Sequence, residues 1–103
     1  MVLDLTSLLG QIDAAFASGL DVESIERTLT DGYAYALELE AERWRLERKI
    51  GEVARLIAGN GAVDHASELA SLSQRLSRAD GDLVELRQHL ATLRRHADVV
   101  RAL

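Results

Sequence analysis

Two histidines are the residues of this sequence best suited to metal chemistry, and a glutamate lies near one of them. Glu85 and His89 are four residues apart, so on a helix they would share a face and could hold one ion between them. His96 lies two turns further along, about 10 Å away at the rise of an α-helix, so the ligands do not converge. The Glu-x-x-His pairs of di-iron bundles are also absent. We interpret both histidines as solvated and predict no metal and no other cofactor.

Nucleophilic catalysis has no matching motif. Four serines recur along the third quarter of the chain, yet no base is spaced to activate them, and we interpret them as a solvated face: Ser67, Ser71, Ser73 and Ser77. No glycine-rich phosphate loop or pair of catalytic carboxylates is recognisable, and the sequence contains no cysteine. We therefore expect a protein that is not an enzyme and has no small-molecule substrate.

A basic run from Arg43 to Lys49 surrounds the single tryptophan, Trp44, and could be taken for a nucleic-acid patch. Its charges would spread round a helix, and carboxylates are interleaved with them at Glu40, Glu42, Glu47 and Glu52. Phosphates favour a continuous positive stripe, whereas the whole chain has a net charge of −5. Nucleic-acid binding is therefore disfavoured. A helical domain that binds metal or nucleic acid is the least favoured functional hypothesis for this sequence.

The composition indicates one helical domain, which we assign to residues 1–103. Hydrophobic residues make up 48 % of the chain but aromatic residues only 4 %, a mixture typical of helix interfaces. No proline is present, so very long helices are permitted. No stretch approaches the ~20 apolar residues of a membrane span. A signal peptide needs a basic start and an unbroken apolar stretch, but the first residues contain Asp4, Thr6, Gln11 and Asp13 instead. We expect a cytoplasmic protein that does not enter the membrane.

Glycine-containing turns divide the chain into three predicted helices, at residues 4–18, 22–58 and 62–102. The first turn contains Gly19 and Asp21, which can end one helix and cap the next. The second turn is Gly59-Asn60-Gly61. In both long segments apolar residues alternate spacings of three and four without a slip, which predicts a long antiparallel coiled-coil hairpin. The first long segment carries Val22, Ile25, Leu29, Gly32, Ala36, Leu39, Arg43, Leu46, Ile50, Val53 and Ile57 at these positions; the second carries Leu69, Leu72, Leu76, Ala79, Leu83, Leu86, Leu90, Leu93, Ala97 and Val100.

Laying one long helix back on the other pairs every seam residue with a seam residue. Leu46 then faces Leu76, and small residues oppose large ones, as where Gly32 faces Leu90. Flanking charges agree with this register, and the pairs we expect are Glu40 with Arg87, Glu42 with Arg75, Lys49 with Glu68, and Glu26 with Arg94 or Arg101. We predict continuous long helices; a hinge at Gly32 or a break near Gly81 is the alternative.

The short first helix is predicted to supply a third layer on one flank, giving a three-helix bundle. Leu5, Leu8, Ile12 and Phe16 form its apolar face. We expect this face to occupy a trough beside the seam formed by Tyr33, Leu37, Trp44, Val84 and Ala91.

Arg43 is the one charged residue on the seam. We predict that its stem packs over Ala79 while the guanidinium reaches Asp80 or Asp82 at the edge. A polar seam residue of this kind can specify helix register, and we assign that role to Arg43, Asp80 and Asp82.

The leading functional hypothesis is a non-catalytic protein–protein interaction or scaffold module. Its candidate interaction surface consists of Tyr33, Leu37, Trp44, Leu56 and Val84, and the simplest partner is a second copy in a homodimer. The outline of a short helix, a tight turn and a long hairpin resembles several bacterial cytoplasmic classes, including flagellar export chaperones. That resemblance implies a second hypothesis, an export or assembly chaperone that holds a client helix in the trough.

Overall fold

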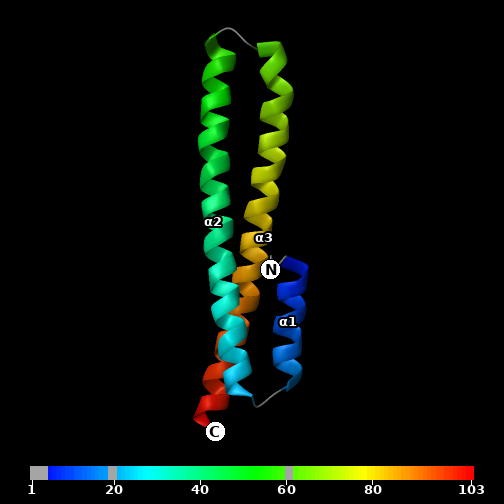
Figure 1. Cartoon of the computed structure of the whole chain (residues 1–103), viewed down its shortest axis with the longest axis vertical. Coiled ribbons are helices and arrows are strands. Elements are labelled where there is room, and N and C mark those ends of the chain that lie inside the picture. Colours follow the sequence, from blue (N-terminus) through cyan, green and yellow to red (C-terminus); the bar gives the residue numbers. More distant parts are fainter. Residues whose placement is uncertain (1–4, 19–20, 60–61) are drawn as a thin grey trace.

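The computed structural model describes residues 5–18, 21–59 and 62–103, and these form three helices and no strand. They are α1 (Leu5–Ser18), α2 (Val22–Gly59) and α3 (Ala62–Ala102). The long helices α2 and α3 run antiparallel, and α1 lies beside their lower half (Figure 1). The molecule is a rod of 64 × 20 × 19 Å. The prediction of an all-α three-helix bundle is confirmed.

An N-terminal cap explains where α2 begins. The Asp21 side chain accepts a hydrogen bond from the Ser24 backbone N–H at 3.2 Å, satisfying a donor that has no partner within the helix. The Asp21 carbonyl accepts the first helical bond, from Ile25 N–H, at 3.1 Å. The cap predicted at Asp21 is therefore present. Gly59, predicted to belong to the second turn, ends α2. The other residues predicted to make the two turns lie outside the described residues: Gly19, Leu20, Asn60 and Gly61.

The seam between α2 and α3 contains two separate apolar clusters. The first, at the end where α1 lies, combines all three helices and comprises Leu8, Ile12, Ala15, Ile25, Leu29, Ala36, Leu83, Leu86, Leu90, Leu93 and Ala97. The second, toward the hairpin tip, uses α2 and α3 alone and comprises Leu46, Val53, Leu72 and Ala79, with partly buried neighbours such as Leu76. Burial of this heptad stripe holds the long helices together. The predicted seam residues thus form the core.

The register of the hairpin agrees with the predicted pairing. Gly32 is buried directly against Leu90, the residue predicted to face it. Glu40 pairs with Arg87, Glu26 with Arg101, and Glu42 with Arg75 at 3.1 Å. Lys49 and Glu68, the fourth predicted pair, form no ion pair in the described part of the chain. Exposed pairs contribute well under ~1 kcal/mol each, so they mark the register rather than stabilise it.

Both long helices run unbroken through their glycines. Gly32 and Gly81 each lie in an uninterrupted helix, so the break near Gly81 is absent, and the hinge stays a hypothesis. Buried seam residues lie on both sides of Gly81, at Ala79 and Leu83. Their packing outweighs the ~1 kcal/mol that a glycine costs in a helix.

The prediction of which flank receives α1 is wrong. The Phe16 ring of α1 contacts the His96 ring of α3, with the centroids 5.1 Å apart and the planes tilted by 46°, and half-buried Tyr35 packs against the cluster that α1 completes. Tyr35 and His96 lie on the flank opposite the trough of Leu37 and Trp44. We call the side beneath α1 the covered flank and the side formed by Tyr33, Leu37, Trp44, Val84 and Ala91 the open flank. The heptad pattern is identical for the two sides of the seam, so tertiary packing makes this choice.

Candidate functional site

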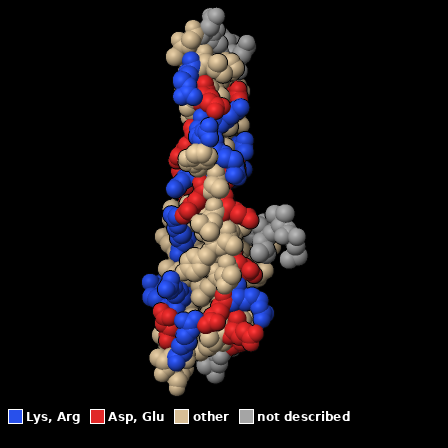
Figure 2. Space-filling view, turned by 60° about the vertical axis from the view of Figure 1, so that its left-hand side comes forward, with Lys and Arg blue, Asp and Glu red and all other residues tan. Residues whose placement is uncertain are grey.

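The open flank carries most of the large apolar side chains that the fold leaves in solvent. Leu37 is 66 % exposed, Trp44 57 %, Val84 55 % and Tyr33 41 %. Figure 2, in which the left-hand side of Figure 1 has come forward, shows uncharged surface gathered near the middle of the rod, with charged side chains above and below it. An exposed apolar strip bordered by charge is typical of a protein-docking surface.

Helical spacing places these residues in one strip. Leu37 and Trp44 are seven residues apart on α2, and Val84 and Ala91 are seven apart on α3, so each pair lies on one face. The ion pair of Glu40 with Arg87 crosses the seam on the same side and lies between the two faces. The two faces therefore lie next to each other on two packed helices.

Polar contacts steady the aromatic residues of the strip. Tyr33 hydrogen-bonds to Arg94 across the seam, and this bond raises the pKa of the Arg94 guanidinium above its usual value. The Arg48 guanidinium lies over the Trp44 ring, 4.8 Å from its centroid. Both arginines are extended side chains whose stems can cover apolar surface. Sequence reasoning missed these two contacts, although the four-residue spacing of Trp44 and Arg48 is a signal for the second.

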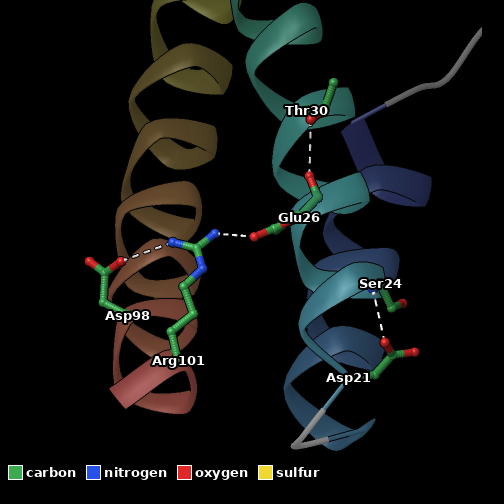
Figure 3. A network of polar contacts seen from close by, with 6 residues as sticks. All are labelled: Asp21, Ser24, Glu26, Thr30, Asp98 and Arg101. Carbon is green, nitrogen blue, oxygen red and sulfur yellow. Dashed lines mark hydrogen bonds and ion pairs between the residues drawn. The ribbon is translucent and has the colours of Figure 1, made fainter.

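The base of the hairpin is joined by a small network around Arg101. Figure 3 shows its guanidinium between Glu26 of α2 and Asp98 of α3, the latter 3.4 Å away. Thr30 donates to the Glu26 backbone carbonyl at 3.0 Å in the same region. The network crosses from the start of α2 to the end of α3 on the side of the open flank.

Arg43 lies at the level where the two apolar clusters meet. Its guanidinium is 3.5 Å from Asp80, one of the two predicted acceptors. No ion pair to Asp82 is present in the described part of the chain. Both partners keep a third or more of their side-chain surface in solvent, so the pair lies at the edge of the seam, as expected. That it specifies the register stays a prediction.

Leu56, the fifth predicted surface residue, is not part of the strip. It is 53 % exposed. It lies seven residues after Lys49, a residue of the covered flank, so helical spacing places Leu56 on that flank too, toward the tip and beyond α1. The structure thus brings together Tyr33, Leu37, Trp44 and Val84 and leaves Leu56 apart.

The covered flank has a polar groove between α1 and the tip. This groove, of about 510 Å³, is lined at its base by Leu46 and Leu72 and at its rim by charged residues of both signs. Glu42 accepts hydrogen bonds from Arg45 at 2.9 Å and from Arg75 at 3.1 Å. These bonds, chiefly the one from Arg45, hold the pKa of the Glu42 carboxyl below its usual value. Glu42, Arg45 and Arg75 of the rim thus pair with one another, whereas Lys49 has no ion-pair partner among the described residues.

The histidines occupy different surroundings. His96 lies beneath α1 against Phe16, so the prediction that it is solvated is wrong. His89 Nδ1 donates to the Glu85 backbone carbonyl at 2.8 Å, a contact within one helix turn. No group of three or more potential metal ligands converges among the described residues.

The chain matches no protein-family model, no curated protein and no solved structure. No helix in the described ranges is both long and apolar enough to cross a lipid bilayer. The functional argument therefore depends on the geometry of the open flank.

Proposed function

We propose that this protein is a non-catalytic interaction module that docks a helical protein partner on its open flank. The observation that carries the proposal is the strip of Leu37, Trp44 and Val84, each more than half exposed on two packed helices. A partner helix that covers the strip would remove this apolar surface from water and is a common mode of recognition. Action in the cytoplasm stays a prediction.

An export or assembly chaperone is the second candidate. It is favoured by one observation, which is that α1 leaves the predicted trough free for a client helix. The fully buried Leu8 and Ile12 anchor α1 on the other flank, so a client would not need to displace it. The two candidates differ in the lifetime of the complex: a client exchanges, and a scaffold partner remains bound.

Site-specific photo-crosslinking in cells tests the docking surface. A photoreactive residue at Leu37 is expected to form a discrete adduct with a protein partner, whereas one at Glu38 is not. Glu38 is a matched control because it is the adjacent exposed residue of α2 and points away from the strip. Equal adducts from both positions, or none from Leu37, would contradict the proposal. Adding Leu37→Asp to a chain that carries the photoreactive residue at Trp44 should abolish the adduct formed there.

A further inference from the structure

On the open flank, α2 and α3 each have a row of charged residues beside the seam, and the two rows are mostly of opposite sign. On α2, three of the four positions spaced seven residues apart beside the strip are acidic, Glu26, Glu40 and Glu47, and the fourth is Tyr33. On α3, Arg87, Arg94 and Arg101 recur in the same way. Two of these acids already reach across to two of these arginines within the chain, Glu40 to Arg87 and Glu26 to Arg101. The row on α3 continues to Asp80, which pairs with Arg43. The open flank thus has an acidic edge on α2 and a basic edge on most of α3.

We propose that the partner of the open flank is a second copy of this chain, packed side by side with both hairpin tips at the same end. This inference rests on the proposed docking function and names its partner. A twofold axis along the rod would place α2 of each copy across from α3 of the other. The acidic edge of one copy would then face the basic edge of the other, and four long helices would form a bundle. An axis across the rod would instead place the acidic α2 edges against each other.

The side chains of the two faces also fit in this arrangement. The contacts of Gly32 with Leu90 and of Glu40 with Arg87 show which residues of α2 and α3 lie at the same level along the rod. Leu37 would face Val84 of the second copy, and Trp44 would face the small Ser77. Toward the tip, Gly51 would face Ala70, so the two rods could approach closely there. All these residues except the partly exposed Gly51 are exposed in the single chain, and none of these three facing pairs brings like charges together.

The mass in solution is the first test. Light scattering coupled to size-exclusion chromatography should give about twice the chain mass of 11.3 kDa at high micromolar concentration. Leu37→Asp should give the monomer mass, with unchanged helicity by circular dichroism since Leu37 is 66 % exposed. Leu56→Asp is the control, because it makes the same change at a similarly exposed leucine of the covered flank and should leave the dimer intact. A wild-type protein near 11.3 kDa overturns the inference.

Single-cysteine variants test the orientation, and the natural chain has no cysteine to interfere. A mixture of Leu37→Cys and Val84→Cys chains, treated with a short bismaleimide, should give a mixed covalent dimer several-fold faster than either variant alone. Glu85→Cys in place of Val84→Cys should lose that advantage, since it turns the thiol away from the strip. Faster linking of Leu37→Cys or Val84→Cys to itself overturns the side-by-side arrangement.

The two proposals fail in different ways. A monomeric protein whose photoreactive residue at Leu37 captures a different protein overturns the second copy and leaves the docking function standing. A monomer without any adduct overturns both. Concentration-dependent fluorescence gives an independent reading, because Trp44 is the only tryptophan and should shift to shorter wavelength as the dimer forms.

Discussion

Gly32 of α2 lies against the side chain of Leu90 of α3, and no other glycine of the long helices has such a neighbour. A methyl group added at Gly32 would overlap Leu90 Cδ2 and lie 3.3 Å from its Cγ. Leu90 is only 1 % exposed, so it has little room to move away. The glycine therefore sets how closely the two long helices approach within the larger apolar cluster.

Alanine substitution at the glycines should separate this packing role from helix propensity. Gly51→Ala and Gly81→Ala place the new methyl in open space and should raise stability by up to ~1 kcal/mol. Gly32→Ala gains the same propensity but forces the helices apart, so we expect a net loss of about 1–3 kcal/mol. Thermal and urea unfolding followed by circular dichroism would measure all three. A stabilised Gly32→Ala protein would show that the helices are not in this register.

Truncation of neighbouring residues should distinguish the seam from the open flank. Leu86 is fully buried, and Leu86→Ala should cost about 2–5 kcal/mol of unfolding free energy. Val84→Ala, two residues away and 55 % exposed, should change the stability of the monomer by less than about 0.5 kcal/mol. Urea titrations at low protein concentration, where association is absent, provide the comparison. Equal losses would contradict the assignment of the two faces.

The position of α1 can be tested with engineered cysteine pairs. Phe16→Cys with His96→Cys should be joined within one chain by a short bismaleimide, because the two side chains are in contact across the covered flank. Phe16→Cys with Arg94→Cys should not, because Arg94 bonds to Tyr33 on the other side of the seam. Electrophoretic mobility before and after treatment with the reagent shows which pair closes. Closure of the second pair alone would return α1 to the open flank.

Glu42 gives the fold a defined acid sensitivity. Its carboxyl has a lowered pKa in the folded protein. The associated stabilisation is therefore fully present above about pH 4.5, the usual pKa, and is lost as the pH falls through the lower pKa of the folded protein. Glu42→Gln should therefore lower the melting temperature slightly near pH 7 and have no effect near pH 3. Glu38→Gln is the control, since Glu38 makes no ion pair in the part of the chain described. A difference between Glu42→Gln and wild type that persists at pH 3 would assign the effect to packing instead.

Most of the hairpin could be read from the sequence alone. The uninterrupted three-and-four spacing identified the seam, and the matching of small with large residues gave the register in which Gly32 meets Leu90. Asp21 marked the start of α2 because a capping side chain acts on backbone groups within the same turn. Such features depend on neighbours along the chain or on a repeating period, and both are visible in a linear sequence.

The side of the hairpin that α1 covers was decided only by the tertiary structure. The seven-residue period specifies which face of each long helix enters the seam, but it treats the two flanking rows alike. Tyr33 and Leu37 on one side and Tyr35 and His96 on the other both offer apolar surface to a short amphipathic helix. The packing of α1 distinguishes them, as the contact of Phe16 with His96 shows, and it depends on three-dimensional fit between segments eighty residues apart. The open flank, and with it the candidate docking surface, follows from that packing because the side left without α1 is the one that stays exposed.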